Sequence, residues 1–159
     1  MIVGSGDIAK VLHDREGALF FASGVSNSAC ESKDQYKREK DLLLSQPKNL
    51  CLFYFSTISI YLKNSAYTRH KTKMEALIRS NFNHYNIIRI GNITWGTNPN
   101  TFINYIRAKK KAGEPYELLD EFRYVIDQEQ LLTLTDNLPL KGQHELCVFG
   151  RMAKPKDLI

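Results

Sequence analysis

A tyrosine and a lysine stand four residues apart in the chain, at Tyr67 and Lys71. On a helix, residues at this spacing share a face, so the phenol and the ammonium would point the same way. An ammonium beside a phenol favours the phenolate and lowers its pKa from the ordinary value of about 10. Such a tyrosine can serve as a general acid or base near neutral pH. The alternative is a packed helix tyrosine next to a solvated lysine, because this spacing often arises by chance.

A second group of residues could bind phosphate. Gly4 and Gly6 follow a short apolar run and precede a segment, Ile8–His13, that contains Ala9 and that we expect to be helical. In a dinucleotide-binding turn, the first glycine permits the tight turn and the second lets backbone N–H groups approach a pyrophosphate at the helix N-terminus. Asp7 would then cap the helix. A plain turn between strand and helix is the alternative interpretation.

One part of that phosphate motif is not found. A carboxylate that holds an adenosine ribose normally lies about 20 positions further on, at the tip of the next strand. Here the next apolar run ends in Ala22-Ser23-Gly24 without a carboxylate, and Glu31 lies well beyond it. This observation counts against ordinary NAD binding.

The elements that must position these residues alternate along the chain. Apolar runs predict strands, and polar or amphipathic segments predict helices between them. We expect strands near residues 1–3, 19–22, 50–55, 86–90, 122–126 and 145–149, and helices over 8–13, 32–45, from a cap at Asn64 or Ser65, over 101–111 and over 128–134. This alternation predicts an α/β fold with a parallel sheet and right-handed crossovers. The length of 159 residues favours a single domain over residues 1–159.

Composition narrows the partners and the compartment. The net charge of +5 suits anionic ligands in general, and Lys109–Lys111 is more typical of a solvated helix end than of a nucleic-acid site, because no aromatic residue is interleaved there. The longest apolar run, Leu50–Leu62, is too short to span a bilayer, and no signal peptide precedes the first strand. We therefore expect a cytoplasmic protein without nucleic-acid or membrane partners.

The cysteines and histidines point away from disulfides and metals. The three cysteines are widely scattered, which favours free thiols in a reducing compartment. The histidines show no ligand spacing, and we expect His70 to face away from Tyr67, so no metal site is predicted. The residues concerned are Cys30, Cys51 and Cys147, and His13, His70, His84 and His144.

Several segments, in this order, resemble the extended short-chain dehydrogenase/reductases that modify nucleotide sugars, namely epimerases, dehydratases and reductases. The matching segments are Val3–Ala9 (glycine-rich turn), Phe20–Val25 (fourth strand and the loop under the cofactor), Phe55–Tyr61 (the strand end with Ser/Thr), Tyr67–Lys71 (YxxxK), Arg89–Gly96 (R-x-x-N-V-Y-G) and, more faintly, Phe122–Leu131 with Asp127. The resemblance covers nearly the whole chain.

The resemblance implies a role for each matching residue. Tyr67 would be the catalytic acid/base, Lys71 would bind the nicotinamide ribose, and Thr57 would complete the catalytic set by bonding the reacting sugar oxygen. Ser56 takes that place if the register slips by one, and Asn92 would contact the nucleotide sugar. NAD or NADP would lie against Gly4, Ser5, Gly6, Asp7, Ile8, Ala22, Ser23, Gly24, Lys71, Ile90 and Ile93. Ile58 and Ser59 stand where 4,6-dehydratases carry an Asp-Glu pair, which disfavours dehydration.

The departures from the family suggest a second hypothesis. Only a short segment separates the glycine turn from Leu19–Ala22, where the family has two further strands. We expect a Rossmann-like parallel sheet, with helices on both faces, in a shortened or atypical member. It is either an NAD(P)-dependent oxidoreductase or epimerase acting on a nucleotide sugar, or a degenerate, non-catalytic nucleotide- or sugar-binding or partner subunit. The family also implies a homodimer through helices near residues 32–45 and 65–80.

Overall fold

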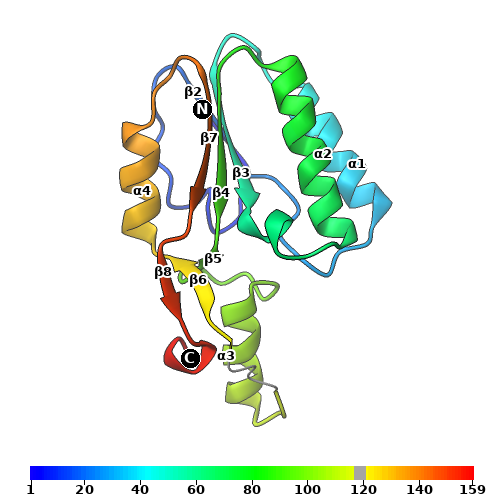
Figure 1. Ribbon diagram of the computed structural model, residues 1–159, viewed down its shortest axis with the longest axis vertical. Helices are drawn as coiled ribbons and strands as arrows, with labels where there is room; N and C mark the ends of the chain where they lie inside the picture. Colours follow the sequence, from blue (N-terminus) through cyan, green and yellow to red (C-terminus); the bar gives the residue numbers. More distant parts are fainter. Residues whose placement is uncertain (117–120) are drawn as a thin grey trace.

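Five parallel strands form the main sheet of the protein. The computed structural model describes residues 1–116 and 121–159. The strand order is β1-β2-β3-β4-β7, and each neighbouring pair is parallel. The strands span Ile2–Val3 (β1), Ala18–Phe21 (β2), Cys51–Thr57 (β3), Tyr85–Ile90 (β4) and Gln143–Val148 (β7). The predicted parallel α/β architecture is thus confirmed (Figure 1).

Helices cover both faces of this sheet. Helices α1 (Lys33–Leu44) and α2 (Ala66–Asn81) lie on one face, and α4 (Gln128–Asn137) lies on the other (Figure 1). All of β2 and β4 is buried, as expected for apolar strands with a covered layer on each side. Leu43 and Met74 belong to the core cluster under α1 and α2, and Leu131 belongs to the opposite one.

The start of α2 is fixed by its own side chains. Thr57 ends β3, and a short 3-10 helix, η1 (Ile58–Tyr61), leads toward α2. Of the two predicted caps, Ser65 is the one used. Its side chain accepts from the backbone N–H of Thr68, and the Thr68 side chain accepts from the backbone N–H of Ser65. This capping box satisfies two of the N–H groups that a helix start leaves unpaired. The orientation of Tyr67 and Lys71 follows from it.

The predicted helix over Ile8–His13 is wrong. Those residues form turns, with a single i to i−4 backbone bond from Lys10 to Gly6. The physical reason lies in Asp7, whose carboxylate accepts from the backbone N–H groups of Thr97 and Asn98 instead of capping a local helix. The glycine turn therefore has no helix N-terminus behind it.

The connection between β1 and β2 carries no additional strand. Residues 4–17, all of which the structure describes, contain turns and extended segments only. β2 pairs directly with β1, through Ile2 opposite Phe20 and Val3 opposite Phe21. The two further strands of the resembling family have no counterpart in this connection.

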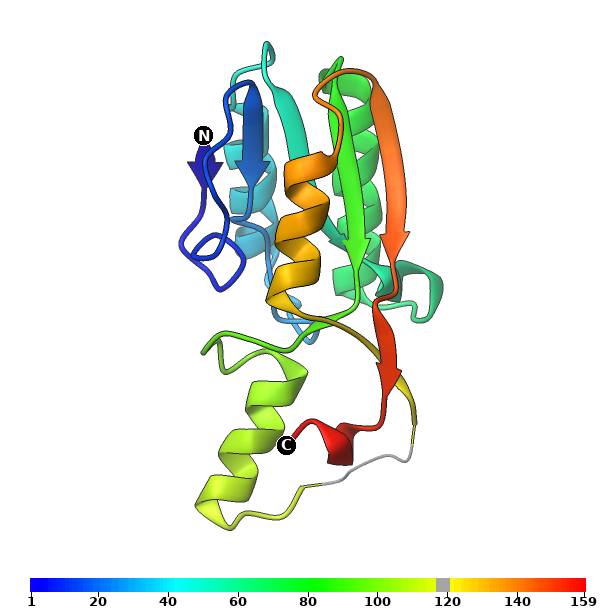
Figure 2. The ribbon, with the colours of Figure 1, turned by 90° about the vertical axis from the view of Figure 1, so that its left-hand side faces the viewer.

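A small second sheet lies beyond the carboxyl ends of the main strands. It has the order β5-β6-β8, from Asn92–Ile93 (β5), Arg123–Ile126 (β6) and Arg151–Ala153 (β8), and β6 runs antiparallel to β8. Helix α3 (Phe102–Ala112) and the 3-10 helix η2 (Pro155–Asp157) pack with it (Figure 2). The predicted strands anticipate neither β5 nor β8, which are two and three residues long.

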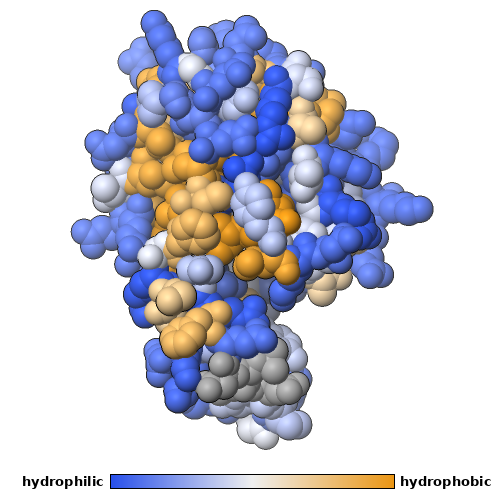
Figure 3. Space-filling model, in the orientation of Figure 1, coloured by the Kyte–Doolittle hydropathy of each residue, from blue (hydrophilic) through white to orange (hydrophobic). Residues whose placement is uncertain are grey.

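The surface differs between the two sides of the main sheet. In the view of Figure 1, hydrophilic atoms cover α1 and α2, whereas hydrophobic atoms gather over the region of β7 and α4 (Figure 3). Tyr61, Leu62 and Phe149 are among the exposed large apolar side chains. Within residues 1–116 and 121–159, no helix combines the length and the apolar character needed to cross a bilayer.

Candidate active site

The parallel strands bring the predicted site residues to one edge of the sheet. Gly4 follows β1, Ala22–Gly24 follows β2, Thr57 ends β3 and Asn92 lies just beyond β4. The carboxyl ends of parallel strands meet at one edge, which is where ligands bind in open α/β sheets. Helix α2 starts near the same edge (Figure 1). Tyr67, in its first turn, is buried.

Tyr67 and Lys71 do share a face of α2, and that face is buried. Tyr67 is 8% exposed and Lys71 only 2%. The Lys71 ammonium lies 5.8 Å from the centre of the Tyr67 ring and 3.2 Å from the hydroxyl of Tyr54 on β3. The alternative of a solvated lysine is therefore wrong.

The nearest anion to Lys71 is Glu39, which the sequence did not single out. Its Oε1 accepts from Lys71 Nζ at 3.0 Å and from the Tyr54 hydroxyl at 2.7 Å. Its Oε2 accepts from the backbone N–H of Val25 at 2.8 Å and lies 2.9 Å from His70 Nε2. Glu39 is completely buried. A signal was present in the sequence, since Glu39 stands four residues before the core residue Leu43 and hence on the inner stripe of α1.

Glu39 is ionised despite its burial. Loss of water alone would raise the pKa of this carboxyl, but the Lys71 charge, aided by bonds from His70, Val25 and Tyr54, holds the pKa well below its ordinary value. His70, which we expected to face away from Tyr67, is buried and stacks on Tyr36 with ring centres 4.2 Å apart. That expectation was wrong because the carboxylate of Glu39 draws both His70 and Lys71 inward.

The pKa of Tyr67 moves in the direction opposite to the one that its spacing from Lys71 suggests. Burial raises it, the Lys71 charge lowers it by a smaller amount, and the Glu39 charge raises it further. The net shift is upward from 10.0. The Tyr67 phenol is therefore protonated at neutral pH.

Gly24 leaves room for the ion pair. A Cβ on this residue would lie 2.7 Å from Lys71 Nζ and 2.9 Å from Glu39 Oε1. The same loop is held by Arg38, which donates to the backbone carbonyl of Ser23 at 2.9 Å. The loop after β2, predicted to lie under a cofactor, thus contacts the Lys71–Glu39 pair directly.

Ser56 and Thr57 lie on opposite sides of β3, as neighbours on a strand must. Ser56 is buried and donates to Glu75 Oε1 at 2.7 Å, and Glu75 is paired with Arg89 of β4. The hydroxyl of Thr57 accepts from the backbone N–H of Ser59 at 3.1 Å and caps η1. Their assignment to sugar binding stays a prediction.

The residues of the glycine turn pack against other segments of the protein. Gly4 has φ +133°, and a Cβ there would lie 2.4 Å from the Ala22 carbonyl oxygen, so its glycine serves the close approach of β1 and β2. Asp7 is 7% exposed and accepts from Thr97 and Asn98 at 3.1 and 2.8 Å. The turn is thereby joined to the loop that follows β5. A Cβ on Gly6 would meet no atom within 4 Å.

The other residues predicted to bind cofactor or substrate differ in their burial and in the protein groups that they contact. Asn92 donates to the Tyr124 carbonyl at 3.2 Å, which ties β5 to β6. Ile90 is buried in the core, Ile8, Ala22 and Ile93 pack against that core, and Ser5 is exposed. Among the described residues, no group of three His, Cys, Asp or Glu side chains is placed to hold a metal. The cofactor and substrate contacts of these residues stay predictions.

The described chain has the fold of the extended short-chain dehydrogenase/reductases that act on nucleotide sugars. One similar solved structure is WbmG from Bordetella bronchiseptica in complex with NAD and UDP, at 17% identity and a TM-score of 0.63. Another is UDP-glucuronic acid 4-epimerase from Bacillus cereus, at 16% identity and a TM-score of 0.66. WbmH of Bordetella bronchiseptica, in complex with NAD⁺, gives 14% identity and a TM-score of 0.68.

These matches extend over most of this chain but over much less of the other proteins. They cover 89%, 95% and 89% of this chain, and 53%, 59% and 55% of the respective relatives. No protein-family profile and no curated protein sequence matches the chain. The comparison therefore shows a common fold, and the chain spans little more than half the length of these enzymes.

Proposed function

We propose that this protein is a non-catalytic relative of the nucleotide-sugar epimerases and dehydratases. It would share their fold and act as a nucleotide- or sugar-binding subunit or as a partner subunit. The observation that carries the proposal is the contact between Lys71 and Glu39, 3.0 Å apart with Lys71 2% exposed and Glu39 completely buried. The lysine that would bind a nicotinamide ribose is engaged by the protein itself.

Releasing Lys71 to a cofactor would be costly. Among the described residues, the Glu39 carboxylate would lose its one fully charged cationic partner, since His70 is charged only if protonated. Removing one partner of a buried ion pair typically costs about 3–5 kcal/mol. The bonds of Lys71 Nζ to Glu39 Oε1 and to the Tyr54 hydroxyl already use two of its three N–H donors. With Lys71 only 2% exposed, these contacts disfavour the family's mode of cofactor binding.

The glycine turn supports the same proposal. Asp7 carries a negative charge at the place where a pyrophosphate would have to approach, and its carboxylate takes two backbone N–H groups of the loop at residues 97–98. No helix follows to offer its N-terminal N–H groups. Residues 4–17 also supply no strand beside β1 for an adenosine to lie against.

Titration of the purified protein with NADH and NADPH, followed by nicotinamide fluorescence, tests the proposal. We expect no saturable change up to millimolar cofactor. The matched variant is Glu39→Gln, which removes the carboxylate charge that holds Lys71. Saturable binding by the wild-type protein below millimolar concentration would overturn the proposal.

The second candidate is an NAD(P)-dependent oxidoreductase or epimerase acting on a nucleotide sugar, with Thr57, Tyr67 and Lys71 as its catalytic set. It is favoured by the position of these residues near the carboxyl edge of a fold whose solved examples include NAD complexes. The nicotinamide would supply hydride transfer, and Tyr67 would move a proton at the sugar hydroxyl. For this candidate, Tyr67→Phe should abolish turnover and leave cofactor affinity nearly unchanged. Turnover that survives this substitution would contradict it.

A further inference from the structure

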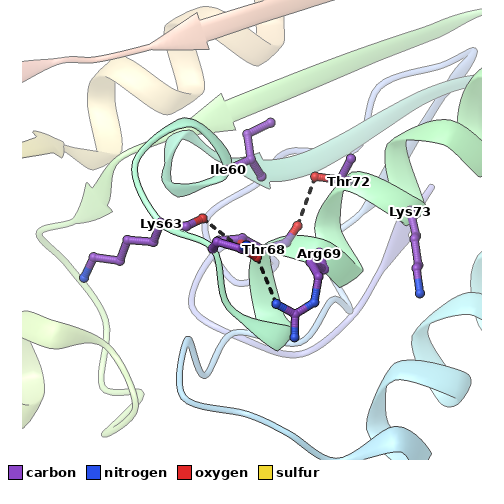
Figure 4. Close-up of a pocket in the computed structure, with 7 residues that line it drawn as sticks. Ile60, Lys63, Thr68, Arg69, Thr72 and Lys73 are labelled. Carbon is purple, nitrogen blue, oxygen red and sulfur yellow. Dashed lines mark hydrogen bonds between the residues drawn. The ribbon is translucent and has the colours of Figure 1, made fainter.

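A basic hollow lies on the outer side of α2, away from Tyr67 and Lys71. It has a volume of about 370 Å³ and is lined by Ile60, Lys63, Asn64, Thr68, Arg69, Thr72 and Lys73 (Figure 4). Lys63 extends from the loop that precedes α2, whereas Arg69 and Lys73 come from the helix one turn apart (Figure 4). Tyr67 and Lys71 point into the protein from the other side of the same helix.

The three cations of this hollow have no carboxylate to balance them. No lining residue is acidic. In the part of the chain that the structure describes, none of the three takes part in an ion pair, whereas Arg79, further along α2, is bound to Glu75 and Glu145. Arg69 and Lys73 stand at i and i+4, where like charges repel each other and destabilise a helix. A bound anion would remove this repulsion.

Neutral groups fix the Arg69 side chain and the backbone of the loop beside it. Arg69 donates to Asn64 Oδ1 at 2.9 Å, and the Thr68 hydroxyl donates to the backbone carbonyl of Lys63 at 3.0 Å (Figure 4). The loop that carries Lys63 is thus tied to the helix that carries Arg69. The first turn of α2 is already capped by Ser65 and Thr68, so a ligand would be bound by the cationic side chains and not by free helix N–H groups.

We propose that this hollow binds a small polyanion with two adjacent phosphoryl groups, that is, a diphosphate. Guanidinium and ammonium groups together suit phosphoryl oxygens, the first by paired N–H donors and the second as a point charge. A volume of about 370 Å³ is at the lower end of ligand sites, which run from about 300 to 1,000 Å³. Ile60 is the only apolar lining residue and no aromatic ring is present, so a nucleobase finds no stacking surface.

Isothermal titration with inorganic pyrophosphate tests the proposal directly. We expect saturable binding to the wild-type protein that weakens as salt is added, because exposed charges are screened. Arg69→Gln/Lys73→Gln should weaken it at least tenfold. The control is Lys111→Gln/Lys156→Gln, which removes the same net charge at exposed residues outside the lining of the hollow and should leave the affinity unchanged. Absent binding, or equal loss in both double variants, would overturn the proposal.

Titrations with further ligands show whether the hollow recognises the diphosphate itself, a nucleoside or a single phosphate. Uridine diphosphate and inorganic pyrophosphate should both bind and should both lose affinity in Arg69→Gln/Lys73→Gln. Uridine alone should not bind, and orthophosphate should bind at least tenfold more weakly. Binding of uridine, or orthophosphate binding as tight as that of pyrophosphate, would contradict recognition of two adjacent phosphoryl groups. These outcomes do not depend on NAD binding, so they can fail or succeed independently of the proposed function.

Discussion

Two groups compete for the charge of Lys71, and their distances decide between them. The carboxylate of Glu39 lies 3.0 Å away, whereas the centre of the Tyr67 ring lies 5.8 Å away. Attraction falls with distance, and a full negative charge outweighs the dipole of a protonated phenol. The sequence indicates correctly that Tyr67 and Lys71 share a helix face. It does not indicate that Glu39 pairs with Lys71, because the two residues are 32 positions apart and meet only through the packing of α1 on α2.

Removal of the Glu39 carboxylate should strongly destabilise the fold. Glu39→Ala would leave Lys71 and the Val25 N–H buried without their acceptor. We expect the free energy of unfolding in urea to fall by about 3–5 kcal/mol. Glu16→Ala, at an exposed residue, should change it by less than about 0.5 kcal/mol. Similar values for the two variants would show that the buried pair contributes nothing to stability.

Acid should weaken the protein through the same carboxylate. The pKa of Glu39 is lowered in the folded state from 4.5, and that of Glu145, bound to Arg79 and opposed by partial burial, is lowered to about 2. A lowered folded-state pKa gives stability that is complete above the unfolded pKa and is lost as the pH falls toward the folded value. Urea unfolding should therefore show a free energy that falls from about pH 5 down to at least about pH 2. Glu39→Gln should flatten this dependence, and an unchanged slope would contradict the assignment.

At the scale of the elements, the turn after β1 shows where local patterns mislead. Gly4, Gly6 and Ala9 have the spacing of a phosphate-binding turn, yet the following residues form no helix. Asp7 is satisfied by N–H groups about ninety residues further along the chain, at Thr97 and Asn98. Long-range bonds of this kind leave no local signal. The strands β2 and β3 were predictable because each contains a continuous apolar run, and β4 because of its Ile87-Ile88 centre and Ile90.

The two glycines of that turn should respond differently to substitution. Gly4→Ala forces a side chain into a backbone with φ +133° and against the Ala22 carbonyl, so we expect a loss of at least about 1–3 kcal/mol in unfolding free energy. Gly6→Ala meets no atom within 4 Å and should stay within about 0.5 kcal/mol of the wild type. Thermal and urea unfolding of both variants measure this difference. Equal losses would contradict the packing role given to Gly4.

At the scale of the whole molecule, the five-stranded parallel sheet and its helices give a fold similar to that of the solved epimerases. β2 lies directly beside β1, and the chain spans little more than half the length of the relatives. The homodimer through α1 and α2 stays a prediction. The single domain and the cytoplasmic location also stay predictions. A mass measurement at micromolar concentration decides the oligomeric state.

We propose that Glu39 occupies Lys71 and thereby keeps a nicotinamide cofactor away from this site. A crystal structure of the protein soaked in millimolar NAD tests it most directly. We predict that Lys71 Nζ remains bonded to Glu39 Oε1 at about the 3.0 Å seen here and that no nicotinamide lies near Tyr67. Nicotinamide ribose bonded to Lys71, with Glu39 displaced, would contradict the account.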